Sequence, residues 1–384
     1  MKKIECITAV LLLAGLVSCG SGKKSELLIV DVMKSYPEET FVLQDIAEVE
    51  YIPLETTDDF LVSDTSAEYV DDDYIIVANT NSGDIMFFDR HTGKGLWKVN
   101  RRGKGAGEYG QAFGLSIDRA NGEMYVRDPN NNRVMVYDLR GAFRRQFDVA
   151  NGNYMTIKDY DPSHLLGYES GWGGTEEMEP FVVLSKEDLS IVKHLEIPFE
   201  ERITMTVPTK NGSVMLHTYP ILEAENGFIL SEFSSDTIYR LDVRDETLTP
   251  VIVRTPKAVG MDVPVNLSVT METSRHIFMQ TTKREYDRDN DIFFPTKYLA
   301  YDKKSGEIYS VKITDENFGG EQDYDIGVTT TAAKQYSAGV SVYGMSAVRL
   351  LDALEAGTLS GKLKDIASGL KEDDNPVLMI VEFK

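Results

Sequence analysis

A short motif recurs through most of this 384-residue chain: an apolar strand end, then an acidic residue or serine, then a turn. It occurs at residues 87–89, 136–138, 183–185, 240–242, 300–302 and 380–382. The spacing is about 50 residues, with a longer last interval, and the residues between the motifs are short apolar-alternating runs broken by turn-forming residues. Several strands per unit at such a period are typical of a β-propeller. The sequence therefore predicts an all-β, six-bladed β-propeller.

The long last interval contains the convincing helical region, residues 346–371. Four of its apolar residues fall on one face of a helix: Leu363, Ile366, Ala367 and Leu370. Gly357 and Gly361 interrupt the pattern. We expect an insertion of two short helices that packs on the propeller as a cap.

A propeller must close its ring, because closure removes the exposed sheet edges of a partial ring. An early apolar run at residues 46–56 has strand character, and we expect it to pair in the sheet that contains residues 375–384. The expected divisions are a signal peptide at 1–18, a lipidated tether and N-terminal segment at 19–45, and the propeller at 46–384.

The N-terminus has the pattern of an export signal. Lys2 and Lys3 precede an apolar run at 7–17, which is too short to span a bilayer as a permanent helix. The run ends in Leu16-Val17-Ser18-Cys19, which resembles the lipobox of bacterial lipoproteins. The resemblance implies cleavage before Cys19, acylation of that cysteine and attachment to a membrane. The alternative is an ordinary secretory signal that contains a cysteine.

The cysteine count agrees with this interpretation. Only Cys6 and Cys19 are present, and Cys6 would leave with the signal, so no thiol would remain for a disulfide, a zinc cluster or a nucleophile. Residues 20–25 read as a flexible tether. Related surface-exported lipoproteins often have acidic residues there, whereas this chain has Lys23 and Lys24. We therefore expect the periplasmic face of the outer membrane, with surface exposure as the alternative.

The formal net charge of -22 makes nucleic acid an unexpected partner, because an acidic protein repels the phosphate backbone. The charges are spread along the chain instead of forming a tail, which is typical of a solvated acidic surface. We expect a monomeric propeller without a cofactor.

One stretch, residues 105–110, matches the Gly-x-Gly-x-x-Gly fingerprint of dinucleotide-binding folds. In such a site the glycine turn leads directly into a helix, and the N–H groups at the helix N-terminus bind the pyrophosphate. Here Phe113, Leu115 and Ile117 alternate with small or polar residues, which indicates a strand. We therefore interpret the match as accidental. The glycines would serve a loop from the outer strand of one blade to the inner strand of the next.

The same stretch, "RRGKGAGEYG" at 101–110, resembles the glycine-glutamate-tyrosine loop of six-bladed β-propeller lipoproteins from gut-associated Gram-negative bacteria. Their usual pattern has proline where this chain has Ala106. Further stretches are similar to signatures of that family at 51–57, 234–242 and 372–384, and residues 126–143 are similar to the NHL repeat of related propellers. The resemblance implies a propeller at the cell envelope. It carries over no catalytic residue, because the family is largely of unknown function.

The residues most suited to contact a ligand lie in polar or aromatic loops. The stretch 101–110 gathers long polar side chains on a glycine-rich connection. The stretch 128–133 is either a tight turn, which Asx residues favour, or a ligand contact. The aromatics of the glycine-rich stretch 168–181 either stack on a sugar or peptide or pack between blades. Our candidates are Arg101, Arg102, Lys104, Glu108, Tyr109, Asp128, Arg133, Tyr168 and Trp172.

No catalytic or metal-binding residue is predicted. The five histidines are scattered, although blades could still bring some of them together on the axis. Residues 287–291 begin like a calcium loop, but Ile292 and Tyr298 stand where an EF-hand needs glycine and glutamate, so a hairpin turn is expected. The expected function is non-catalytic binding of a glycan, a peptide or a partner protein. The alternatives are an envelope hydrolase or lyase acting at the propeller axis, and a structural subunit of an envelope assembly.

Overall fold

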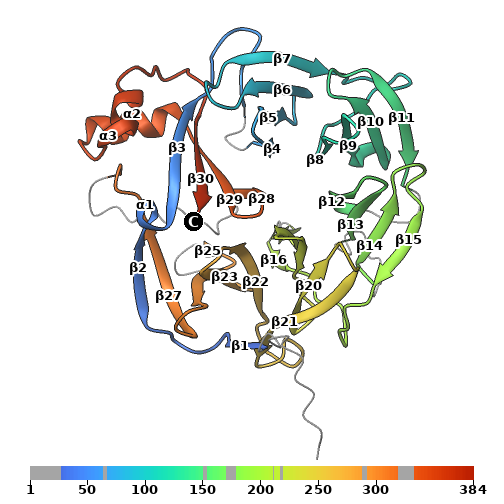
Figure 1. Ribbon diagram of the computed structural model, residues 1–384, viewed down its shortest axis with the longest axis vertical. Coiled ribbons are helices and arrows are strands. Elements are labelled where there is room, and N and C mark those ends of the chain that lie inside the picture. The colour runs from blue at the N-terminus through green and yellow to red at the C-terminus, as the bar shows by residue number, and fades with distance from the viewer. Residues whose placement is uncertain are drawn as a thin grey trace, which may run out of the picture.

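The computed structural model describes residues 27–384, apart from 64–66, 150–153, 170–178, 211, 217–218, 288–291 and 319–332. The described strands form six sheets of four or five strands, arranged as blades around a ring, and two separate two-stranded hairpins (Figure 1). The predicted six-bladed propeller is confirmed.

Blades 1 to 3 each consist of four antiparallel strands that follow one another in the sequence. Blade 1 contains β4 (Tyr69–Val70), β5 (Tyr74–Asn79), β6 (Asp84–Asp89) and β7 (Gly95–Asn100). Blade 2 contains β8 (Leu115–Asp118), β9 (Glu123–Asp128), β10 (Arg133–Asp138) and β11 (Phe143–Asp148). Blade 3 contains β12 (Tyr154–Asp161), β13 (His164–Glu169), β14 (Phe181–Ser185) and β15 (Ile191–Leu195). The first strand of each lies toward the axis and the fourth at the rim (Figure 1).

Blades 4 to 6 follow the same plan with additions. Blade 4 contains β18 (Ile221–Ala224), β19 (Gly227–Leu230), β20 (Thr237–Asp242) and β21 (Thr247–Thr255). Blade 5 contains β22 (Val265–Glu272), β23 (His276–Lys283), β26 (Thr296–Asp302) and β27 (Glu307–Thr314). Blade 6 contains β28 (Ala333–Ser337), β29 (Val340–Met345), β30 (Val377–Phe383) and β3 (Ala47–Pro53).

The recurring sequence motif marks the third strand of every blade: β6, β10, β14, β20, β26 and β30. A third strand has neighbours on both edges, so its apolar residues are buried, as Phe87 and Phe88 are. The acid at the strand end begins the next turn by accepting hydrogen bonds from its main chain. Asp89 Oδ1 accepts from the N–H of Thr92 at 2.9 Å, and Asp138 Oδ1 accepts from the N–H of Ala142 at 2.9 Å. The motif thus combines a central strand with an Asx turn.

The ring closes as expected, by pairing of an early strand with the last one. β3 runs antiparallel to β30 over its whole length, from Ala47 opposite Phe383 to Pro53 opposite Val377. A short helix, α1 (Leu43–Ile46), leads into β3.

Two strands before β3 also belong to the blades. β1 (Leu28–Asp31) pairs in parallel with β21, and β2 (Glu38–Val42) pairs in parallel with β27, so each adds a fifth strand at the rim. The propeller therefore includes residues that lie before the expected start at residue 46. Val30 is fully buried in the apolar core shared by blades 4 and 5, which explains why this segment stays on the sheet.

The helical insertion is confirmed as two short helices between β29 and β30, α2 (Ala347–Glu355) and α3 (Gly361–Ala367). Gly357 follows α2 with φ of 71°, a left-handed conformation that ends helices at low cost for glycine. Leu350 and Leu363 are fully buried in one cluster with Met379 of blade 6. The helix pair therefore extends the core of the closing blade.

Asn375, just before β30, binds the connection that follows the closing strand β3, and its removal tests what stabilises the closed ring. Asn375 is buried, and its amide donates to the carbonyl oxygens of Glu55 at 2.7 Å and Phe60 at 2.6 Å. Its Oδ1 accepts from the N–H of Val62 at 2.8 Å. We expect Asn375→Ala to lower the free energy of unfolding by about 2–3 kcal/mol, because it leaves buried main-chain groups without partners. Chemical denaturation measures this, and Asn130→Ala, at an exposed asparagine, should change stability by less than about 0.5 kcal/mol. Equal losses of unfolding free energy from the two substitutions would contradict a role for Asn375 in holding the ring closed.

Candidate functional site

Successive strands of a blade run in opposite directions, so the connections alternate between two faces of the ring. The turn face carries the short connections between first and second strands, at 71–73, 119–122, 162–163, 225–226, 273–275 and 338–339. The loop face carries the long connections, at 101–114, 196–220, 284–295 and 346–376. Binding residues are concentrated on loops held by a rigid scaffold, which makes the loop face the first place to look for a site.

The connection 101–114 joins the outer strand β7 to the inner strand β8 of the next blade, as the sequence predicts, and no helix begins there. Its glycines permit close packing. A side chain at Gly103 would collide with the carboxylate of Glu108, and one at Gly107, where φ is 75°, would collide with the ring of Phe143. The fingerprint match therefore reflects packing between blades 1 and 2 and not a phosphate site.

Tyr109 is not available to a ligand. Its side chain is 0% exposed, and its hydroxyl donates to the carbonyl oxygen of Gly83 at 2.7 Å. The hydroxyl also accepts from the N–H of Arg101 at 3.0 Å. Burial raises the pKa of Tyr109 to about 12. This tyrosine fixes the connection in the seam between blades 1 and 2.

The charged residues of the same connection also have intramolecular partners. Arg101 Nε donates to the carbonyl oxygen of Gly141 at 2.8 Å. The guanidinium of Arg102 donates to the carbonyl oxygen of Asn81. Glu108 Oε2 accepts from the N–H of Gly105 at 2.7 Å. Lys104 is exposed on the surface. Arg101 and Arg102 are nevertheless also exposed, so of the candidates in this stretch only Tyr109 is excluded by burial.

Asp128 and Arg133 form a second fixed unit next to this connection. Asp128 is fully buried, and its two oxygens accept from the N–H groups of Gly110 at 2.9 Å and Gln111 at 3.3 Å. Arg133 Nη2 lies 3.2 Å from Asp128 Oδ2 and donates to the carbonyl oxygen of Glu108 at 3.2 Å. The turn interpretation of 128–133 matches this structure, and Asp128 is too buried to contact a ligand.

Tyr168 is also buried, with its ring 4.8 Å from that of Phe181. Burial, followed by the nearby charge of Glu232, raises the pKa of Tyr168 well above its ordinary value. It packs in the apolar cluster between blades 3 and 4 and does not present its ring to a ligand. Trp172 and Cys19 lie outside the described residues.

Two hairpins on the loop face were not predicted as site elements. β16 (Thr206–Thr209) pairs with β17 (Gly212–Met215), and β24 (Tyr286–Asp287) pairs with β25 (Ile292–Phe293). β16 and β25 are drawn inside the ring of outer strands (Figure 1). The second hairpin flanks residues 288–291, where the sequence predicts a hairpin turn, although those residues themselves lie outside the described ones.

The two hairpins pack on each other through a small apolar cluster of their own. Met205, Val207, Phe233 and Phe294 are buried in it. Arg284 Nη1 donates to the carbonyl oxygen of Thr204 at 3.4 Å, which adds a polar tie between the two connections. Elements from blades 3, 4 and 5 are thereby joined into one raised structure on the loop face.

This raised structure exposes apolar side chains, which we call the hairpin patch. Its members are Val214, Tyr219, Ile292 and Phe293, each more than a third exposed. Phe293 stacks on Tyr286 with ring centroids 4.2 Å apart, so its orientation is fixed. A sequence signal for the first hairpin exists in Asn211-Gly212, a dipeptide typical of tight hairpin turns.

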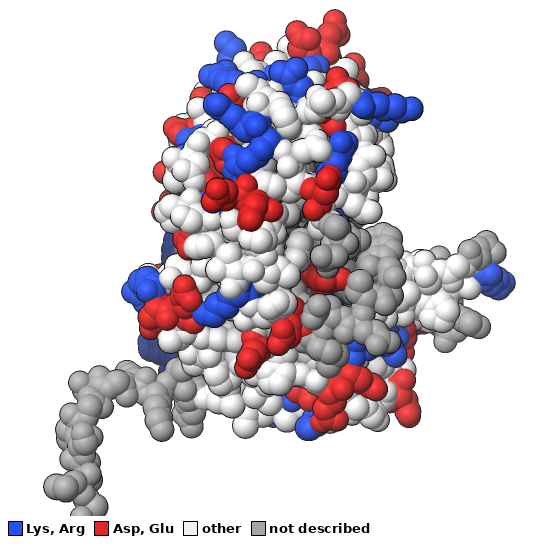
Figure 2. Space-filling model, turned by 90° about the vertical axis from the view of Figure 1, so that its right-hand side faces the viewer, with Lys and Arg blue, Asp and Glu red and all other residues white. Residues whose placement is uncertain are grey.

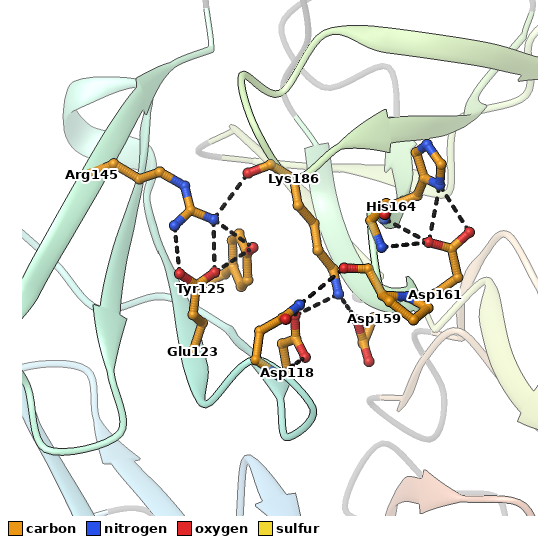
Figure 3. Close-up of polar contacts among 11 residues, drawn as sticks. Asp118, Glu123, Tyr125, Arg145, Asp159, Asp161, His164 and Lys186 are labelled. Atoms are coloured by element: carbon orange, nitrogen blue, oxygen red, sulfur yellow. Dashed lines mark hydrogen bonds and ion pairs between the residues drawn. The ribbon is translucent and has the colours of Figure 1, made fainter.

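The turn face is occupied by ion pairs across the seams between blades. Lys186 of blade 3 lies 2.6 Å from Asp118 of blade 2 and 2.6 Å from Asp159 (Figure 3). Beside it, Arg145 binds Glu123 through two hydrogen bonds of 2.5 and 2.7 Å and donates to the carbonyl oxygen of Lys186 at 3.0 Å. These contacts hold blade 2 to blade 3.

The two aspartates of this network differ in their electrostatics. Burial alone would raise the pKa of Asp118, but the hydrogen bond from Lys186 and two from Asn121 outweigh it, so this pKa is lowered. For Asp159 burial dominates over Lys186, and its pKa is raised. Lys186 therefore binds two carboxylates in different environments, and each polar atom of Lys186 and Asp118 has a protein partner.

Histidines do not converge on the axis within the described part of the chain. His164 lies 2.9 Å from Asp161 at a turn of blade 3, and His194 lies 3.1 Å from Glu179. His276 is buried against Phe41, and burial lowers its pKa. Among the described residues, no group of three His, Cys, Asp or Glu side chains is arranged to hold a metal ion.

The side of the ring seen in Figure 2 shows Lys and Arg interspersed with Asp and Glu, without a large area of a single sign. Within the residues that the structure describes, no helix has the length and apolar character needed to cross a membrane.

The Lys186 network yields a stability prediction. Lys186→Ala leaves the fully buried Asp118 without its cation, and we expect a loss of about 3–5 kcal/mol in the free energy of unfolding. The matched control is Lys193→Ala, which removes an exposed pair of similar length with Glu246 and should cost less than about 1 kcal/mol. Urea titration at neutral pH measures both. A cost for Lys186→Ala as small as that of the control would mean that the seam does not depend on this pair.

Comparison with known proteins agrees with the fold. A Bacteroides fragilis protein considered to be exported shares 15% sequence identity, with a TM-score of 0.63 over 90% of this chain and 99% of that one. A member of the DUF4221 family from Bacteroides vulgatus shares 10% identity, with a TM-score of 0.50 over 88% of this chain and 97% of that one. No curated protein matches the sequence. Residues 27–382 match the family described as Domain of unknown function (DUF4934), and the chain belongs to that family.

Proposed function

We propose that this protein is a lipid-anchored binding module of the cell envelope, which recognises a protein or peptide partner through the hairpin patch on the loop face. The observation that carries the proposal is that the two hairpin connections share a buried apolar cluster and that each of them also exposes large apolar or aromatic side chains. Apolar side chains that remain in water on a rigid support are typical of interaction sites.

The chemistry of the patch favours a polypeptide over a glycan. Aliphatic side chains such as Val214 and Ile292 offer no hydrogen bond to a sugar hydroxyl. Among the described strands, β16 and β17 pair only with each other, so the hairpin has free edges. An extended peptide can add to a free strand edge through main-chain hydrogen bonds and place apolar side chains in adjacent contacts.

The residues of the connection 101–114 contribute less to partner binding in this proposal than the hairpin patch does. Because Arg101 and Arg102 bind main-chain oxygens of neighbouring turns, they shape the loop face more than they present free charges. Lys104 remains available at its surface and could add a charged contact at the edge of the binding face.

The envelope location is supported by three observations. The first 19 residues have the order of a lipoprotein signal. A fold neighbour is considered to be exported. The described chain begins at the rim strand β1, close to Cys19 in sequence, so a short tether would connect the lipid to the propeller.

The binding proposal can be tested by site-specific photocrosslinking in cells that export the protein. A photoreactive amino acid at Ile292, which is 48% exposed, should form a discrete adduct with a protein partner. The same group at Val192, 55% exposed on the rim strand β15, should not. Phe293→Ser should reduce the adduct about tenfold, as expected for loss of one apolar anchor. Adducts of equal yield at both positions, or at neither, would contradict the proposal.

The anchoring proposal predicts the fate of Cys19. Metabolic labelling with an alkyne fatty acid should tag the wild-type protein and recover it with membranes. Cys19→Ala should abolish the label and remove the lipid anchor, because no other cysteine of the mature chain could accept the acyl group. A soluble, unlabelled wild-type protein would identify the N-terminus as an ordinary secretory signal.

A further inference from the structure

The outermost strand of blade 4 has apolar residues on both of its faces. In β1 and the residues that follow it, Val30 and Val32 are buried against the core of blades 4 and 5. The alternate positions point the other way, because successive side chains of a strand lie on opposite faces. Ile29, at such a position, is 63% exposed, and Leu27 before the strand and Met33 in the turn after it are 40% and 59% exposed. Natural edge strands usually carry charged residues there.

The remaining residue of that outer face, Asp31, places one carboxylate among the apolar side chains. Asp31 turns its carboxylate back to the chain, where Oδ1 accepts from the N–H of Met33 at 2.9 Å. Ile29 is in register with Val253 of β21, which extends the apolar surface onto the neighbouring strand. Lys34 follows directly, with its ammonium group 5.1 Å from the ring centroid of Tyr36. The result is a set of exposed apolar side chains that includes one carboxylate, with a cation at its end.

The position of these exposed apolar residues in the sequence indicates that a lipid bilayer can cover them. Leu27 follows Cys19 by eight residues, which span at most roughly 26–29 Å even when fully extended. The region around Leu27 is therefore the first part of the folded domain to meet a bilayer that holds the lipid. A tether this short keeps these side chains at a high effective concentration at the membrane surface.

We propose that Leu27, Ile29 and Met33, named here the rim strip, insert their side chains into the interfacial region of the membrane that anchors the protein, with Lys34 facing anionic headgroups. This rests on the lipid anchoring proposed above. The propeller then meets the membrane at the outer strand of blade 4.

The test uses residues 19–384, whose only thiol is Cys19. This thiol is coupled to a maleimide lipid in vesicles of phosphatidylethanolamine and phosphatidylglycerol that contain a diazirine acyl chain. After illumination, lipid adducts should concentrate in peptides that cover residues 27–34. The double variant Ile29→Asp with Met33→Asp should lose most of them, several-fold relative to the parent, because the aspartates oppose insertion. Its unfolding temperature should be unchanged, since both side chains are exposed.

A matched control carries Ile191→Asp and Val192→Asp on the rim strand β15, where exposure is comparable, and should leave the adducts unchanged. Adducts that persist in the Ile29 and Met33 variant would reflect proximity alone and would overturn the proposal. So would adducts centred on another part of the surface. Since maleimide coupling does not need acylation in cells, failure here is distinguishable from failure of the anchoring proposal.

Discussion

Closure of the ring by β3 and β30 is the interaction on which the rest of the structure depends. The last blade receives its outer strand from the N-terminal part of the chain and its other strands from the C-terminal part, so the two ends hold each other. Without this pairing, blade 6 would present a free edge and the apolar side chains between blades 6 and 1 would be open to water. β1 and β2 extend the same principle, because they tie the N-terminal segment to blades 4 and 5 before it reaches blade 6. A ring held in this way keeps the positions of its loops fixed, which is what a binding face needs.

Closure brings blades together at their inner strands, and the chain must then cross from rim to axis between them. Each crossing segment has main-chain groups that cannot all join a sheet, and a polar residue at or near the end of a second strand binds them in several blades. Asn79 accepts from the N–H of Ser63 at 2.8 Å, Asp128 binds Gly110 and Gln111, and Ser234 accepts from the N–H of Ile203 at 2.8 Å. Asn375 does the same for the segment after β3. Unpaired main-chain groups are costly when buried, so these residues are structural wherever a crossing segment meets a seam. This explains why polar residues that looked available in the sequence have partners in the structure.

The sequence predicts the number of blades because the third-strand motif repeats a physical requirement. In blades 1, 2, 4 and 5 a strand paired on both edges is followed by an Asx turn, as Phe88 with Asp89 and Tyr137 with Asp138 show. The rim strands β1 and β2 could not be predicted in this way. They are short, pair in parallel with distant strands and have no hairpin turn to mark them. The ligand-binding residues are harder still to predict from the sequence, because an aromatic residue in a glycine-rich loop can be exposed to water or buried between two blades. Tyr109 and Tyr168 face seams, and nothing local in their sequence distinguishes that outcome from exposure.

Several charged side chains of the turn face already form ion pairs within the protein, so they are less available to bind a partner. On the turn face, Arg119 bridges to Asp71 and Asp73, Arg240 to Glu272, and Lys186 to Asp118, so these three cations pair with carboxylates across or beside a seam. Charges paired at 2.5–2.9 Å are poor anchors for a partner, because binding would have to break an existing contact. The hairpin patch has no such cost, since its apolar side chains lose only water. If the rim strip rests on the membrane, the patch is held close to the bilayer, and the partners within its reach are those held at a similar height above the same membrane. The geometry of anchoring then selects the partner as much as the chemistry of the patch does.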